Sequence, residues 1–143
     1  MNKRSIIAST RTIPFPVEKV WDAWTNPEIF AKWWGPKGFT NTIHQFDFRV
    51  GGRCKFTMHG PDAGHYENEM EITFIAAPDR ITWKRITQPY FHVDVSFEAV
   101  GDKQTKILWH MIFDSEETYR KIVQFAPEKN EENLDRLEAV LMS

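Results

Sequence analysis

The sequence contains almost no cysteine: Cys54 is the single one among 143 residues. One cysteine excludes an intramolecular disulfide and any metal site built from several cysteines. The N-terminus also lacks the apolar stretch of a secretory signal peptide. Disulfide-free chains are typical of reducing compartments. We therefore expect a cytoplasmic protein.

The sequence also lacks a large excess of either positive or negative charge. The 18 Lys and Arg residues nearly balance the 20 Asp and Glu residues, which leaves a net charge of -2. No basic block is present to bind a nucleic acid, and no apolar run is long enough for membrane insertion. We expect no nucleic acid, membrane or cofactor as a partner. Internal repeats and linkers are lacking too, so residues 1–143 are expected to form one domain.

Aromatic residues, by contrast, are abundant. The chain has 11 Phe, 6 Trp and 3 Tyr residues, 14% of its length. So many rings in a chain of this size predict either a very full core or a core with a hollow lined by rings.

Residues 13–36 predict two short helices in succession. Asn26 is a good N-cap and Pro27 suits the first position of the second helix, which Gly35 and Pro36 end. Helices this short are marginal alone, so the pair must pack against a large apolar surface. The apolar face of the first helix is expected to consist of Val17, Val20, Trp21 and Trp24.

Alternation of apolar and polar residues predicts a series of strands separated by turns rich in Gly, Pro and Asp. The last strand is apolar on both parities, which indicates a strand covered on both faces or one near a homodimer contact. Ser115 then caps a helical segment, and a long helix is expected from 127 to 141. The expected strands are residues 5–13, 42–50, 53–59, 65–75, 81–86, 92–100 and 105–113.

An antiparallel meander with one ring-rich face can bury that face by curling around a helix. We therefore predict an α+β helix-grip fold. It would have a curved antiparallel sheet of about seven strands around the long C-terminal helix, with two short helices between the first two strands. This order of elements resembles START domains and the birch-pollen-allergen lipid carriers.

Several segments sharpen the resemblance. In the same order, they are similar to segments of bacterial proteins that resemble the C-terminal domain of the activator of Hsp90 ATPase, within the SRPBCC (START-like, Bet v 1-like) superfamily. The match covers nearly the whole chain. The segments are Pro16-Val17-Glu18-Lys19-Val20-Trp21, Asn26-Pro27, Trp33-Trp34-Gly35-Pro36, residues 47–53, residues 78–83 and Leu134-Asp135-Arg136-Leu137.

The resemblance implies a site in the hollow between the curved sheet and the terminal helix, but it carries no shared catalytic motif. Asn68 and His44 are polar residues on the expected inner face, and each needs a hydrogen-bond partner: a side chain, a trapped water or the polar end of a ligand. The rings on this face are either cavity lining or plain core packing. The residues expected to face the hollow are His44, Phe46, Phe48, Phe56, Met58, Asn68, Met70, Ile72, Trp83, Phe97, Phe125 and Asn130.

Metal and nucleophile chemistry find little support. His59 and His65 flank a hairpin loop that contains Asp62, but their parity points both outward, so no metal site is expected. Cys54 has an inward parity and is expected to be an inert small hydrophobe; only His44 could activate it. No catalytic residue is assigned.

Three classes of function stay open. Binding of a small hydrophobic or lipid-like molecule is favoured, because the inner face consists mostly of rings and methionines. A cyclase- or hydrolase-type enzyme would need a positioned acid or base, for which His44, His110 and Asp94 are the candidates. A role as a chaperone (Hsp90) partner is implied by the resemblance alone.

Overall fold

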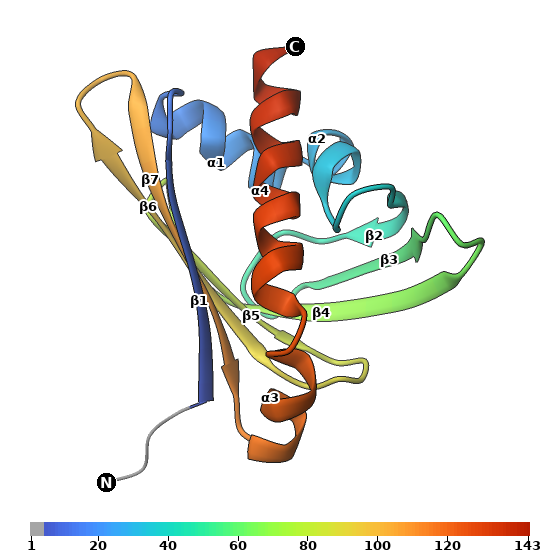
Figure 1. The fold of residues 1–143 in the computed structure, drawn as a ribbon. Coiled ribbons are helices and arrows are strands. Elements are labelled where there is room, and N and C mark those ends of the chain that lie inside the picture. Colours follow the sequence, from blue (N-terminus) through green and yellow to red (C-terminus); the bar gives the residue numbers. More distant parts are fainter. Residues whose placement is uncertain (1–4) are drawn as a thin grey trace, which may run out of the picture.

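The computed structural model describes residues 5–143, which form one curved antiparallel sheet around a long helix (Figure 1). The strands lie in the order β1-β7-β6-β5-β4-β3-β2. β1 and β2 are therefore opposite edges of the sheet, although they follow one another along the chain. The strands are β1 (Ser5–Ile13), β2 (Thr40–Phe46), β3 (Arg53–His59), β4 (His65–Ala76), β5 (Arg80–Arg85), β6 (His92–Val100) and β7 (Gln104–Phe113).

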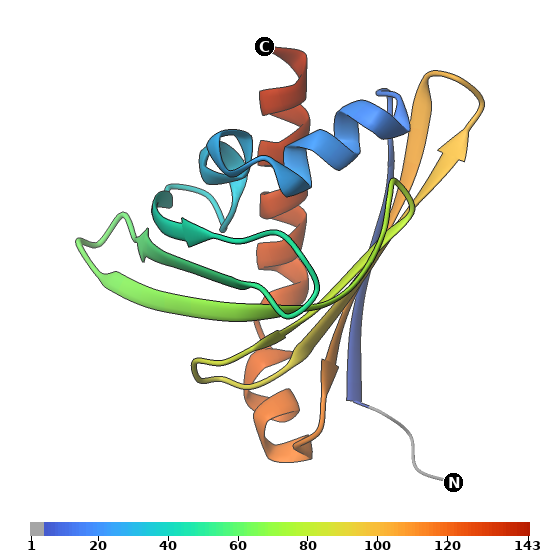
Figure 2. The same cartoon turned by 180° about the vertical axis from the view of Figure 1, so that it is seen from behind.

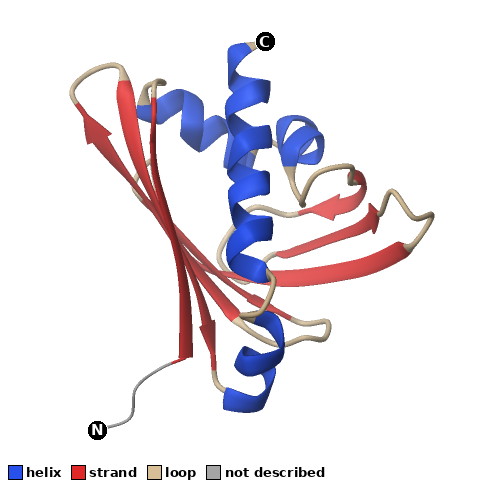
Figure 3. Ribbon diagram, in the orientation of Figure 1, coloured by secondary structure: helices blue, strands red, loops and turns tan. Residues whose placement is uncertain are grey.

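The helices all lie on the concave side of the sheet (Figure 3). The long α4 crosses this side, with α3 at its N-terminal end and the pair α1 and α2 beside its C-terminal half. Figure 2 shows the same sheet from behind, bent so that β3 and β4 run at a steep angle to β1. The predicted helix-grip fold is confirmed. The helices are α1 (Val17–Thr25), α2 (Pro27–Trp33), α3 (Glu116–Ile122) and α4 (Ala126–Met142).

The predicted helix caps are confirmed in detail. The Asn26 side chain accepts a hydrogen bond of 3.0 Å from the backbone N–H of Glu28, and Pro27 occupies the first turn of α2. At α3, the Ser115 hydroxyl accepts from the backbone N–H of Thr118 at 3.2 Å. These caps satisfy N–H groups that have no partner inside the helix, so each helix begins where its sequence indicates.

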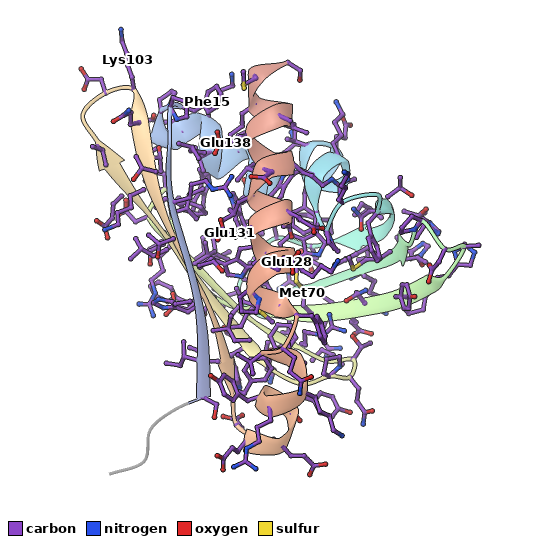
Figure 4. The ribbon with its side chains drawn as sticks, in the orientation of Figure 1. Phe15, Met70, Lys103, Glu128, Glu131 and Glu138 are labelled. Carbon is purple, nitrogen blue, oxygen red and sulfur yellow. The ribbon has the colours of Figure 1, made fainter. Side chains whose placement is uncertain are left out.

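An ion-pair cluster joins α4 to the β1 edge. The guanidinium of Arg11 lies 2.8 Å from carboxylate oxygens of both Glu131 and Asp135, and 3.1 Å from one of Glu138. Figure 4 shows Glu131 and Glu138 on the side of α4 that faces β1. One arginine, whose aliphatic part is largely buried, thus forms ion pairs with three carboxylates of α4. The cluster therefore restricts rotation of α4 about its axis more than a single exposed ion pair would.

The expected strand at 42–50 is wrong in part, because β2 ends at Phe46 and its pairing with β3 shifts between Ile43 and Gln45. This β-bulge reverses the facing of the residues before it. Ile43 packs against the core, and His44 is exposed on the outer face, where its Nε2 lies 2.7 Å from the hydroxyl of Thr57. The expectation that His44 faces the hollow is therefore wrong.

The core is a cluster of aromatic rings centred on Trp24, which is 2% exposed. Five rings have their centroids within 6.3 Å of the Trp24 ring, in mostly edge-to-face geometry that aromatic pairs prefer. They come from the last residue of α2, from the residue that follows it and from three strands, so Trp24 connects the helix pair to the sheet. The five are Trp33, Trp34, Trp83, Phe97 and Trp109.

Replacing Trp24 by Ala should destabilise the fold by about 3–5 kcal/mol, because it empties the centre of this cluster. Trp21→Ala on the same helix is the matched control. Trp21 is only half-buried and meets two rings, Phe48 and Phe97, so its loss should cost clearly less. Urea denaturation followed by circular dichroism measures both; equal midpoints would contradict the central position of Trp24.

Candidate functional site

A cavity of about 160 Å³ lies between the concave face of the sheet and the N-terminal half of α4. Its wall comes from β3 to β7, from the turn after α2 and from α4. Figure 4 shows one of its residues, Met70, beside the first turns of α4. Most of its lining is apolar and much of it aromatic: Trp34, Phe56, Met58, Met70, Trp83, Phe91, Val93, Trp109 and Met111.

A wider hollow of about 810 Å³ adjoins this inner cavity on the side of the loop between β5 and β6 and of the junction between α3 and α4. The two share part of their lining, which we call the neck. The inner cavity therefore continues toward the surface through the neck. The neck residues are Pro36, Met58, Asn68, Arg85, Phe91, Met111 and Asn130.

Apart from His44, the residues expected to face the hollow fall into three groups. Four of them pack in or against the hydrophobic core and do not line the inner cavity: Phe46, Phe48, Ile72 and Phe97. Phe125 is 53% exposed and borders only the outer hollow and the adjacent surface. The structure brings the other six together around the inner cavity: Phe56, Met58, Asn68, Met70, Trp83 and Asn130.

Asn68 is buried at the neck, and its hydrogen-bond partners belong to the protein. Its side-chain oxygen accepts a hydrogen bond from the guanidinium of Arg85, and its Nδ2 donates to the carbonyl of Tyr66 at 3.1 Å. Asn130, also buried, has only long contacts from its Nδ2, 3.4 Å to the Ser9 hydroxyl and 3.4 Å to the Met111 sulfur. These two amides thus add polar groups to a cavity whose lining is mostly apolar.

The sequence reasoning missed Arg85 among the cavity-lining residues, and likewise Trp34, Phe91, Val93, Trp109 and Met111. Arg85 follows Trp83 by two positions on β5, so the same parity that placed Trp83 inward also places Arg85 inward. Its guanidinium lies 5.3 Å from the centroid of the Phe91 ring. Burial lowers the pKa of Arg85 to about 10, because removal from water disfavours the charged form.

The wall formed by Trp34, Gly35 and Pro36 is held by α4. Arg136 donates from Nη1 to the carbonyls of these three residues at 2.9–3.1 Å, and from Nη2 to two more carbonyls nearby. Asn133 accepts from the Gly35 N–H and donates to the carbonyl of the residue before Trp34. Gly35 has φ +97°, a conformation that residues with a Cβ rarely adopt, so a larger residue there would be strained, and its Cβ would also push against the end of the Met58 side chain at 2.8 Å.

None of the acid or base candidates lies on the cavity. His44 is on the outer face, and Asp94 is paired there with Arg80 at 2.8 Å. His110 lies opposite Asp94 in the register of β6 and β7. Its side chain is on the face of β7 opposite to that of the neighbouring Trp109, which lines the cavity. Glu69 does border the cavity, but its carboxylate forms an ion pair of 2.6 Å with Arg53.

The two histidines at the β3–β4 hairpin face each other rather than a shared ion. Nδ1 of His59 lies 2.7 Å from Nδ1 of His65, and Nε2 of His59 lies 2.7 Å from the Thr42 hydroxyl. Among residues 5–143, no group of three or more His, Cys, Asp or Glu side chains is placed to hold a metal ion. In the same range, no helix is both long and apolar enough to cross a membrane.

Comparison with known proteins identifies a matching family and a shared fold. The sequence model of the family described as "Activator of Hsp90 ATPase homolog 1-like protein" matches residues 14–142. No curated protein matches the chain.

Several solved bacterial structures share the fold. The solution structure of a protein from Arthrobacter aurescens is 24% identical, with a TM-score of 0.89, and the match covers 99% of this chain and 90% of that one. A crystal structure from Nitrosomonas europaea is 18% identical with a TM-score of 0.85, covering 96% and 94%. The AHSA1 protein from Silicibacter pomeroyi is 20% identical with a TM-score of 0.75, covering 96% and 97%. At these identities, the likeness concerns the fold alone.

Arg136→Gln should lower the free energy of unfolding by about 1.5–3 kcal/mol, because the shortened neutral side chain leaves backbone carbonyls of the cavity wall without their charged donor. Arg120→Gln is the control, since Arg120 makes an exposed pair with Glu116 four residues away. That control should change stability by no more than about 0.5 kcal/mol. Urea denaturation measures both, and a loss no larger for Arg136→Gln than for the control would refute the anchoring role.

Cys54 should be unreactive in the folded protein. It is buried, and burial raises the pKa of its thiol to about 12, so at pH 8 only about one molecule in 10,000 carries the reactive thiolate. Ellman's reagent should therefore label the native protein far more slowly than the urea-unfolded chain, which serves as the control. Rapid labelling of the native protein would show that the β3 region opens readily.

Proposed function

The chain belongs to the family of Activator of Hsp90 ATPase homolog 1-like proteins, on a fold that commonly binds hydrophobic ligands, and from this we propose that it binds a small hydrophobic molecule in the inner cavity. The observation that carries the proposal is the lining of that cavity. Rings and methionine side chains surround it, and a few polar groups stand together at one end. Mostly apolar walls with a few convergent polar groups are typical of small-molecule sites.

The dimensions support a ligand with a compact apolar end. A dry engineered cavity of about 150 Å³ holds benzene, so the inner cavity of about 160 Å³ suits one ring or a short branched chain. The rest of a larger ligand would pass the neck into the outer hollow of about 810 Å³. The ligand would then be enclosed at its apolar end and partly exposed at the other.

Binding is proposed rather than catalysis because an acid or base must reach its substrate within about 3 Å, or through one water. The three candidates, His44, Asp94 and His110, lie on the outer face of the sheet. A role as an Hsp90 partner has the family description as its support, and no particular contact among residues 5–143 adds to it.

The proposal is tested with a neutral probe, 3-phenylpropan-1-ol, whose ring matches the inner cavity. Calorimetry should detect binding, and Met111→Trp should weaken it at least tenfold, because the larger side chain fills the neck where Met111 borders both spaces. Met142→Trp is the matched control, since Met142 is 74% exposed at the end of α4.

Two results would reject the proposal. No binding of the neutral probe at millimolar concentration would show that the inner cavity does not accept such groups. Binding that Met111→Trp leaves unchanged, with the variant folded as judged by its circular dichroism spectrum, would place the probe elsewhere on the protein.

A further inference from the structure

The cavity places a cation beside its apolar wall without a matching anion. Arg85 borders both the inner cavity and the outer hollow. Among residues 5–143, none of its hydrogen bonds goes to a carboxylate; its acceptors are backbone carbonyls, the Thr87 hydroxyl and the Asn68 amide. Arg85 is half-buried, and a charge that is partly removed from water is normally paired with an opposite charge, so this arginine needs an explanation.

The acidic residues that line the inner cavity and the outer hollow, Glu69 and Glu67, have other partners. The Glu69 carboxylate is bound by Arg53 at 2.6 Å. The Glu67 carboxylate accepts from the Thr57 hydroxyl at 2.8 Å, on the outer face of the sheet. On the rim of the outer hollow, Lys129 adds a second cation, 3.8 Å from Glu132. The neck is therefore a position where a negative charge on a ligand would be favoured.

The number of unused hydrogen-bond donors at the neck indicates what size of anion could bind there. A guanidinium has five N–H donors. Within the described part of the chain, Nε and Nη2 of Arg85 use their three on Thr87, Gln88 and Pro89, and Nη1 uses one on Asn68. One Nη1 hydrogen is left over. Asn68 uses one of its two amide hydrogens on Tyr66, which leaves one more.

Two free donors on adjacent side chains suit the two oxygens of a carboxylate better than the three oxygens of a phosphate. The bond between Asn68 and Arg85 keeps these donors next to each other, at the neck. A ligand whose ring lies in the inner cavity would present a group one to three atoms further along to this pair. An apolar acid with a short chain between ring and carboxylate meets both requirements.

We propose that the ligand is an aromatic or compact apolar carboxylic acid, whose carboxylate is bound at the neck by Arg85 and Asn68 while its apolar end fills the inner cavity. This assignment rests on the proposed binding function and names its substrate class. It also gives Arg85 a role beyond its hydrogen bonds to the loop between β5 and β6.

The test compares 3-phenylpropionate with 3-phenylpropan-1-ol, which differ at the polar end only, by calorimetry at pH 7.5 and low salt. The wild-type protein should bind the acid at least tenfold more tightly than the alcohol. Arg85→Gln should reduce that preference for the acid over the alcohol to less than about twofold. Arg49→Gln is the matched control and should change neither affinity, because Arg49 is exposed in the loop after β2 and pairs with Asp47.

The outcomes separate the two proposals. If the wild-type protein binds the alcohol but binds the acid no more tightly, the carboxylate site is refuted and the hydrophobic site stands. If Arg85→Gln weakens acid and alcohol equally, Arg85 only supports the wall, and the carboxylate site is again refuted. If the alcohol does not bind at millimolar concentration, the binding function itself fails, whether or not the acid binds. Should Arg85→Gln not fold, the wild-type preference for the acid over 3-phenylpropionamide decides, and equal affinities overturn the proposal.

Discussion

The attachment of α4 to the turn after α2 is the constraint on which the other features of the site depend. Arg136 and Asn133 bind the backbone of residues 32–39, where the chain leaves the helix pair and has few backbone hydrogen bonds of its own. Without these donors, the turn would have several carbonyls facing the protein interior with no partner. The same bonds hold the Trp34 ring against the cavity and bring together two segments that lie about a hundred residues apart. They therefore close one end of the space that the curved sheet opens.

The two ends of the cavity differ, and its polar groups lie toward one of them. The end near Trp24 is filled by rings and has no room for a ligand, while the end near β5 and α3 opens to the surface. Arg85 stands between the two ends, held by the loop that follows it. Desolvation makes its charge expensive and, for the same reason, makes an interaction with an anion stronger than it would be in water. On our proposal, a cavity with these properties would select molecules that combine an apolar body with an acidic group.

The strands that were predicted correctly and those that were not show which features depend on local sequence alone. Strand boundaries followed from alternation for β1, β3 and β6, and the caps of α2 and α3 followed from Asn26 and Ser115. At β2 the rule failed, because a bulge between Ile43 and Gln45 changes the facing of the strand and sends His44 outward. A second register shift, between Ile72 and Phe74, leaves Phe74 exposed on β4. A bulge depends on how two strands pair, so the alternation within either strand cannot reveal it.

The sequence by itself determined the helix-grip fold, the ring-rich face and six of the residues that surround the cavity, since these follow from spacing along the chain and from the resemblance of its segments. Only the tertiary structure decided which rings fill space and which leave it open. Phe97 and Trp83 have the same character in the sequence, yet the first lies in filled core and the second borders the cavity. The helix pair packs into one end of the curved sheet and not the other, and packing density is a property of the assembled layers. For the same reason, the sequence could not show that Arg85 lies beside the cavity without a carboxylate partner, since this depends on which groups the fold brings around it.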